Sequence, residues 1–293
     1  MSMKILLLGN TGQVGWELNR TLLTLGELIA MDYPQIDMSD PGNIRSIVRE
    51  HKPNLIVNAT AYTNVDKAES EPDLAMAING TSPGILAEEA NRLNGALIHY
   101  STDYVFDGTK EEPYVEEDIP NPINAYGETK LAGEKAVQEI DGAYLIFRTS
   151  WVYSSRRPCF VTKVLKWARK QETLRIVDDQ ISSPTWSRTL AEATAQVIAQ
   201  SMGTPVDYIQ GKKGIYHMAG RGACSRYEWA KTILELDPNR KEQLTKELHR
   251  AKSSDFHTDA KRPLYSVLNT ERLSNGFSLP LPDWKNCINI LLN

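Results

Sequence analysis

A glycine-rich loop near the N-terminus is the feature that most limits what this chain can fold into. The loop, Gly9-Asn10-Thr11-Gly12-Gln13-Val14-Gly15, directly follows a short apolar run at residues 5–8. Glycines between a strand and a helix let the backbone approach a pyrophosphate, whose charge is met by amide groups at the positive end of the helix. The spacing G-x-x-G-x-x-G differs from the common G-x-G-x-x-G, and a plain turn would also use glycines. Its place after the first predicted strand favours a dinucleotide-binding loop.

Short apolar runs alternate with longer helical patterns through the first half of the chain, which is typical of a parallel sheet built from βαβ units. The runs lack a clear alternation of polar and apolar residues, as expected when helices cover both faces of the sheet. We therefore predict an α/β fold, a Rossmann-type doubly wound parallel sheet. The predicted strands are 5–8, 28–31, 55–58, 96–101 and 144–148, and the predicted helices are 14–25, 41–51, 72–93 and 125–139.

The pattern becomes less regular after about residue 150, where helices are predicted at 160–170, 190–202 and 225–236. We predict that residues 1–150 form the dinucleotide-binding domain and that residues 151–293 form mainly a smaller substrate-binding lobe. In doubly wound folds the last strands can return to the first domain, so the boundary stays open.

Composition excludes several classes of protein. The chain is 41% hydrophobic and 24% charged with a formal net charge of −4, which is ordinary for a globular protein and offers no basic surface for nucleic acid. Its three cysteines, Cys159, Cys224 and Cys287, are far apart and predict neither a disulfide framework nor a zinc site. The apolar run at 5–8 is too short for a secretion signal or a membrane span. We expect a cytoplasmic protein.

Two acidic residues follow the second predicted strand. Asp32 stands where a carboxylate accepts hydrogen bonds from the adenosine ribose, and its charge opposes a phosphate there, which favours NAD. A distant cation such as Arg20 would still permit NADP. Asp37 and Met38 fit an edge contact with adenine, but Asp37 equally fits a cap of the helix that begins near Pro41.

A phenol and an ammonium group stand four residues apart at Tyr126 and Lys130, hence on one face of a predicted helix. A nearby cation favours the tyrosinate, so we expect Lys130 to lower the pKa of Tyr126 and make it an effective proton donor. Thr102 ends the fourth predicted strand, at the sheet edge where open α/β folds bind ligands. The structural alternative for Tyr126 and Lys130 is a solvated helix face. The alternative for Thr102 is a hydroxyl that hydrogen-bonds within the turn after the strand.

Five segments give the chain a resemblance to a known superfamily. They are residues 12–18, 65–69, 101–106, 126–134 and 148–153. With them the sequence resembles the extended short-chain dehydrogenases/reductases and, among these, the reductases that complete dTDP-L-rhamnose synthesis. The resemblance implies hydride transfer from NADPH or NADH to the C4 keto group of a dTDP-linked 4-keto-6-deoxysugar.

The resemblance also implies roles for particular residues. The catalytic residues would be Thr102, Tyr126 and Lys130. Cofactor contacts would come from Gly9, Gly12, Gln13, Val14, Asp32, Asp37, Met38, Ala61, Tyr62, Thr63, Tyr126 and Lys130. Thr102, Asp103 and Trp151 would face the sugar, although Trp151 equally fits a core position. Arg262 matches a basic position that could meet the diphosphate, with a surface arginine as the alternative.

Some reductases of this kind join two subunits through a divalent metal held by acidic residues. Glu17 matches one such ligand, but Arg188 stands at the position of a second. Because a cation repels a metal, we expect no metal site, and a monomer rather than a metal-bridged dimer.

The sequence thus predicts a ketone reductase. The enzymatic rivals are an epimerase or a dehydratase for another nucleotide sugar, although a dehydratase commonly needs an Asp-Glu pair where this chain has Asp103-Tyr104. The remaining rival is a regulatory subunit that kept the nucleotide pocket without catalysis.

Overall fold

The main sheet has six parallel strands in the order β10-β5-β4-β3-β1-β2. The structure, a computed structural model, describes residues 3–201 and 204–293. The strands are β1 (Lys4–Leu8), β2 (Glu27–Met31), β3 (Leu55–Asn58), β4 (Ala96–Thr102), β5 (Ala143–Thr149) and β10 (Gly214–His217). The chain leaves β1 toward β2 and returns to β3 on the other side, so the switch point of a doubly wound sheet lies there. The predicted fold class is confirmed.

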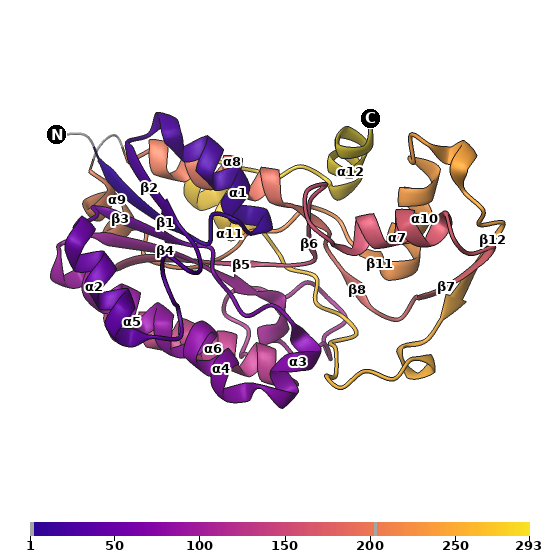
Figure 1. Ribbon diagram of the computed structural model, residues 1–293, viewed down its shortest axis with the longest axis horizontal. Coiled ribbons are helices and arrows are strands. Elements are labelled where there is room, and N and C mark those ends of the chain that lie inside the picture. Colours follow the sequence, from indigo (N-terminus) through magenta and orange to yellow (C-terminus); the bar gives the residue numbers. More distant parts are fainter. Residues whose placement is uncertain (1–2, 202–203) are drawn as a thin grey trace.

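Helices cover both faces of this sheet (Figure 1). One face carries α1 (Gln13–Thr21), α8 (Ser187–Ala199), α9 (Pro205–Gly211) and α11 (Glu271–Phe277). The other carries α2 (Pro41–His51), α3 (Val65–Ser70), α4 (Pro72–Met76), α5 (Ser82–Arg92) and α6 (Ala125–Glu139). Along β1, Ile5 and Leu7 enter one core while Leu6 and Leu8 enter the other. This double burial explains the continuous apolar run.

A smaller lobe extends from the carboxyl edge of the sheet (Figure 1). It contains α7 (Phe160–Ala168), α10 (Arg226–Glu235) and α12 (Trp284–Leu292) around a separate core that includes Tyr153 and Trp229. Its short strands are β6 (Val152–Tyr153), β7 (Thr173–Val177), β8 (Ile181–Ser182), β9 (Thr185–Trp186), β11 (Cys224–Ser225) and β12 (Glu247–Ala251). They pair as β11-β8, β12-β7 and β6-β9.

Parts of the second half of the chain return to the main sheet. Strand β10 pairs with β5, and α8 packs against α1. The predicted helix 190–202 is α8, which begins three residues earlier, at Ser187; Met202 lies outside the described residues. Among the helices of the described chain, none is long and apolar enough to cross a membrane.

The predicted helix 72–93 is divided by a π-helical turn, Ala77–Thr81, between α4 and α5. The turn directs the Asn79 amide at the backbone of Tyr62, with Asn79 Oδ1 accepting from Tyr62 N at 2.8 Å and Nδ2 donating to Tyr62 O at 3.1 Å. Helical periodicity continues across such a turn, so the sequence did not reveal it.

Candidate active site

A cavity of about 620 Å³ lies at the carboxyl ends of β1, β2 and β3 and reaches α6. The predicted cofactor contacts that line it are Gly9, Gly12, Gln13, Val14, Asp32, Asp37, Met38, Ala61, Thr63, Tyr126 and Lys130. Tyr62 is not among its lining residues, because its phenol turns away to hydrogen-bond the Glu71 carboxylate. The cavity therefore unites nearly all of the residues that the resemblance had assigned to a dinucleotide.

The glycine loop leaves room for a dinucleotide. Gly9 has φ of +85°, and a Cβ there would lie 2.9 Å from the carbonyl carbon of Ala59. A Cβ on Gly15 would lie 1.9 Å from Gly9 O, so this glycine lets α1 start directly against the loop. No side chain caps the α1 N-terminus, which leaves its amide groups for a phosphate. The residues present thus fit the pyrophosphate of a nicotinamide cofactor.

Asp32 lines this cavity directly after the end of β2. Its Oδ2 accepts hydrogen bonds from Thr11 Oγ1 at 2.5 Å and from Thr11 N at 3.1 Å. The predicted helix-capping alternative for Asp37 is wrong, because Asp40 caps α2 through Gly42 N. Ser39 instead donates to Asp37 from both its hydroxyl and its amide, and these bonds lower the pKa of Asp37.

Arg20 does not reach the cavity. It forms an ion pair with Glu17 at 3.2 Å on the outer side of α1. The cation that does line the cavity beside Thr11 and Asp32 is Arg157, whose Nη2 donates to Thr11 Oγ1 at 3.0 Å. The sequence analysis missed Arg157, because only the folded chain brings residue 157 to the glycine loop.

Thr102 and Tyr126 meet where β4 ends and α6 begins. Asn124 caps α6 by accepting from Gly127 N at 2.8 Å. A Cβ on Gly127 would lie 2.2 Å from Tyr104 O, so this glycine allows α6 to approach the turn that follows Thr102. The Thr102 hydroxyl accepts from Tyr104 N at 3.2 Å, which is the turn-satisfying role, and it also lies beside the Tyr126 phenol.

The predicted lowering of the Tyr126 pKa is wrong. Burial raises the pKa of this phenol because removal from water penalises the phenolate, and the neighbouring Thr102 hydroxyl only partly opposes this effect. Lys130 does not lower it, since its ammonium group is directed elsewhere. A phenol that stays protonated near neutral pH suits a proton donor.

Lys130 is fully buried and belongs to a chain of polar contacts under the cavity. Its Nζ lies 2.7 Å from Tyr100 O and 3.3 Å from His99 Nε2. His99 Nδ1 lies 3.1 Å from Asn58 Nδ2, and Asn58 Oδ1 accepts from Thr60 N at 3.1 Å. Burial lowers the pKa of Lys130 to about 8. His99 was not predicted from the sequence.

Asp103 is buried and joins β4 to the smaller lobe. Its carboxylate accepts from Ser266 Oγ at 2.6 Å, from Ser182 Oγ at 3.3 Å and from Thr102 Oγ1 at 3.1 Å. Burial raises its pKa to about 6. It lines neither this cavity nor the second one, described next, so its predicted contact with a sugar stays a prediction.

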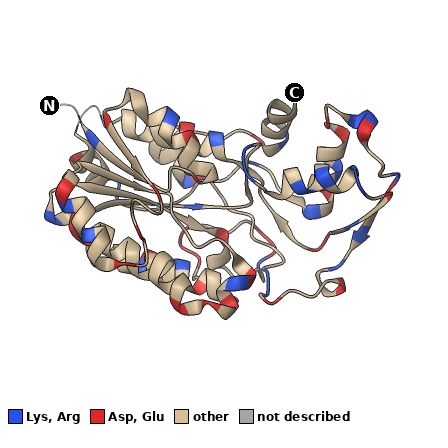
Figure 2. Ribbon diagram, viewed as in Figure 1, with Lys and Arg blue, Asp and Glu red and all other residues tan. Residues whose placement is uncertain are grey.

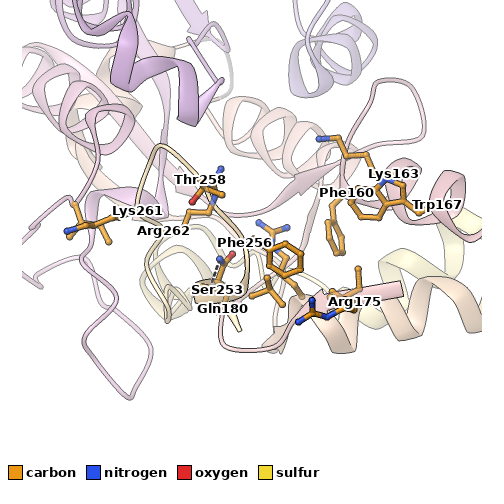
Figure 3. A pocket seen from close by; sticks show the side chains of 14 residues that line it. Phe160, Lys163, Trp167, Arg175, Gln180, Ser253, Phe256, Thr258, Lys261 and Arg262 are labelled. Carbon is orange, nitrogen blue, oxygen red and sulfur yellow. Dashed lines mark hydrogen bonds between the residues drawn. The ribbon is translucent and has the colours of Figure 1, made fainter. Parts of the chain in front are cut away.

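A second cavity of about 760 Å³ lies in the smaller lobe (Figure 3). Its cations are Lys163, Arg175, Arg226, Lys261 and Arg262, and its aromatic side chains are Phe160, Trp167 and Phe256. None of the described residues that line it is acidic. Figure 2 shows Lys and Arg residues, together with Asp and Glu residues, along this lobe. Such a lining favours an anionic ligand with an aromatic part.

Of the predicted substrate residues, Arg262 lines this second cavity, and Trp151 packs against Arg226, which lines it. Arg262 lines it and donates to Asp66 Oδ2 at 2.7 Å, so it is not a solvated surface arginine. Trp151 is half-buried and stacks on Trp229 at 5.5 Å between ring centroids. The Arg226 guanidinium lies 3.6 Å over the Trp151 ring. Trp151 thus supports the lobe core and positions a cation that lines the cavity.

The residues around Glu17 do not fit a divalent metal. Glu17 is paired with Arg20, and Arg188 donates to Glu192 at 2.8 Å on the adjoining helix α8. Within residues 3–201 and 204–293, no group of three His, Cys, Asp or Glu side chains is arranged to hold a metal. Two guanidinium groups among these carboxylates disfavour a dication.

The doubly wound sheet, the glycine loop and the Tyr126–Lys130 pair facing one cleft are features of extended short-chain dehydrogenases/reductases. The sequence matches the family described as RmlD substrate binding domain over residues 3–293, and the chain belongs to that family.

Relatives of known name agree with this membership. The chain is 43% identical to dTDP-4-dehydrorhamnose reductase of Escherichia coli K12, with 99% of this chain and 97% of the relative covered. It is 40% identical to the reductase of that name from Burkholderia thailandensis, covering 98% and 97%. The crystal structure of dTDP-4-dehydrorhamnose reductase from Bacillus anthracis in complex with NADP has a TM-score of 0.88 at 31% identity and covers 99% of both chains.

Proposed function

We propose that this protein reduces the C4 keto group of dTDP-4-dehydro-6-deoxy-L-mannose to dTDP-L-rhamnose, using NADPH or NADH. Relatives at 40–43% identity over nearly the whole chain carry the name dTDP-4-dehydrorhamnose reductase. The product is the activated rhamnose for cell-surface polysaccharide. The proposal goes beyond family membership, because it names the substrate and the cofactor of this chain.

The adjacency of the two cavities carries this proposal. Ile123 and Tyr126, three residues apart at the start of α6, line the second cavity and the dinucleotide cavity respectively. At the start of α7, Pro158 lines the dinucleotide cavity and Phe160 lines the second cavity. A cofactor in one cavity and a substrate in the other would therefore meet beside Tyr126, which is what direct hydride transfer requires.

The proposed mechanism assigns one task to each residue. The bound nicotinamide supplies the hydride. Tyr126 donates the phenolic proton to the oxygen that becomes the C4 hydroxyl, and Thr102 donates a hydrogen bond to the same oxygen. Lys130, whose Nζ lies beside Tyr100 O and His99 Nε2, would hold the nicotinamide ribose rather than the phenol. Protein burial around Tyr126 keeps its proton in place until the ketone accepts it.

The second cavity is the proposed site for the dTDP part of the substrate. Its five cations suit a diphosphate, and Phe160, Trp167 and Phe256 offer surfaces on which a thymine ring can stack. Arg262 is the proposed diphosphate contact. We also propose that the sugar lies between the two cavities, in contact with Thr102, Asp103 and Trp151.

The proposal includes the organisation of the protein. Residues 1–150 would form the dinucleotide domain, joined by β10, and residues 151–293 mainly the substrate lobe. The arginines beside Glu17 and Glu192 support a monomer without a metal bridge. Three buried cysteines without disulfides support a reducing cytoplasm.

The decisive assay mixes the protein with dTDP-6-deoxy-L-lyxo-4-hexulose and follows loss of NADPH or NADH absorbance. We expect one cofactor oxidised for each dTDP-L-rhamnose formed. An epimerase or dehydratase would recycle its cofactor and show no net oxidation. Cofactor binding without any turnover would favour the regulatory subunit.

A further inference from the structure

Loop 154–158, which leads from β6 into α7, is attached directly to the glycine loop. Ser154 Oγ donates to Gln13 Oε1 at 2.9 Å. The Arg156 guanidinium lies 3.1 Å over the Trp16 ring on the outer side of α1. These contacts fix a segment of the second half of the chain over the pyrophosphate end of the dinucleotide cavity.

Arg157 extends from this loop toward the acid that would meet the adenosine ribose. Its Nη2 donates to Thr11 Oγ1, and the Thr11 hydroxyl in turn donates to Asp32 Oδ2. Arg157 therefore lies two hydrogen bonds from the Asp32 carboxylate. Of the described residues that line this cavity, Lys130 is the other cation, and it belongs to the catalytic end.

The charge of Arg157 matters because Asp32 alone would repel a phosphate on the adenosine ribose. Within the described chain, no carboxylate lies within ion-pair distance of Arg157, whereas Arg20 is already paired with Glu17. The Arg157 side chain is exposed, so it can turn about its flexible stem without disturbing a core. A guanidinium group binds a phosphate through two parallel charged hydrogen bonds.

We propose that Arg157 is a specificity residue that lets the cavity accept a 2′-phosphate, and hence NADPH as well as NADH. With NADPH the guanidinium group exchanges Thr11 for the 2′-phosphate and offsets the Asp32 charge; with NADH it stays on Thr11 while Asp32 accepts the free ribose hydroxyls. The inference rests on the proposed function only in placing the adenosine ribose beside Asp32.

The test measures binding by calorimetry with two cofactor fragments, 2′,5′-ADP and 5′-AMP, which differ in the 2′-phosphate alone. Arg157→Gln should lower the affinity for 2′,5′-ADP by about tenfold, as expected for loss of one exposed charged contact. The affinity for 5′-AMP should stay within about twofold of the unmodified protein's value. Arg20→Gln is the control, because Arg20 is a cation of α1 that pairs with Glu17 and does not line the cavity, and the change should leave the affinity for both ligands nearly unchanged. In turnover, Arg157→Gln should lower kcat/KM for NADPH about tenfold more than for NADH.

Three results would overturn the assignment. The first is an equal loss of affinity for both fragments in Arg157→Gln, and the second is no loss of affinity for either. The third is failure of the unmodified protein to bind 2′,5′-ADP. Absence of sugar reduction with both cofactors would contradict the proposed function, while the ratio of the two fragment affinities would still decide the role of Arg157.

Discussion

His99 Nε2 faces Lys130 Nζ at 3.3 Å, and the surrounding hydrogen bonds fix which of the two atoms donates. Thr60 N donates to Asn58 Oδ1, so the Asn58 amide must present Nδ2 to His99 Nδ1. His99 Nδ1 is therefore the acceptor, and the proton of this neutral ring lies on Nε2. That N–H points at Lys130 Nζ, so it can donate to the neutral amine and it opposes the ammonium form.

The first prediction is that His99 carries its proton on Nε2. Nitrogen-15 NMR of histidine-labelled protein distinguishes the two neutral tautomers by their ring-nitrogen shifts. Five histidines are present, and His99→Phe assigns the signal. A proton on Nδ1 would contradict the network.

The same network predicts how activity depends on pH. Burial favours neutral Lys130, whereas the Glu134 carboxylate on the same helix favours the charged form. The N–H of His99 that points at Lys130 Nζ also disfavours the ammonium. With a pKa of about 8, Lys130 loses its charge as the pH rises through that value, so reduction should slow above pH 8. In His99→Phe this decline should move to higher pH, because one group that disfavours the ammonium is gone.

Tyr126→Phe should lower turnover by about 10²-fold or more, the range expected for loss of a positioned proton donor. Cofactor affinity should change little, since the ring remains. Tyr100→Phe is the control, because its hydroxyl is bonded to Thr194 at 2.6 Å within the core. Single-turnover rates measure both variants. Near-normal turnover of Tyr126→Phe would show that another group donates the proton.

Lys163→Gln should raise KM for the nucleotide sugar about fivefold, corresponding to roughly 1 kcal/mol for one exposed charged contact, with kcat little changed. Lys166, one turn along α7 and also exposed, does not line the second cavity, so Lys166→Gln provides the control. Equal effects of the two variants would indicate general electrostatic attraction rather than a diphosphate site. Steady-state kinetics at two salt concentrations separates these cases.

The N-terminal half and the central chemistry could be read from the sequence because both are local. The predicted strands of β1 to β5 lie within two residues of the observed bounds, since all but β2 are largely buried runs, and β2, at the sheet edge, still has an apolar sequence. Tyr126 and Lys130 are four residues apart on one helix. His99 and Lys130 are 31 residues apart, and Arg157 and Thr11 are 146 apart, so neither contact has a local signal.

The strands of the smaller lobe could not be predicted from the sequence, for a related reason. Its strands β6, β8, β9 and β11 have two residues each, too few to show any period. Strand β12 lies in a charged segment and is mostly exposed. Its pairing with β7, rather than its own composition, makes it a strand.

The stability of Asp103→Asn relative to the unmodified protein should be greater at pH 8 than at pH 5. Folding raises the pKa of Asp103 from 3.8 to about 6, so the folded state binds more protons between those values and stability falls as pH rises through this range. Asparagine removes the buried charge, and its advantage should grow by roughly 1 kcal/mol between pH 5 and pH 8. Urea unfolding at both pH values measures it. A constant difference would mean that Asp103 is not protonated near pH 5.

The central claim is that hydride passes directly from the nicotinamide to C4 of the sugar beside Tyr126. The most direct measurement uses NADPH deuterated at the transferring position of C4, with the 4-keto sugar nucleotide in ordinary water, and locates deuterium in the product by NMR. We predict one deuterium at C4 of dTDP-L-rhamnose and none at C3 or C5. A product with hydrogen at C4, or no product while the cofactor binds, would contradict the account.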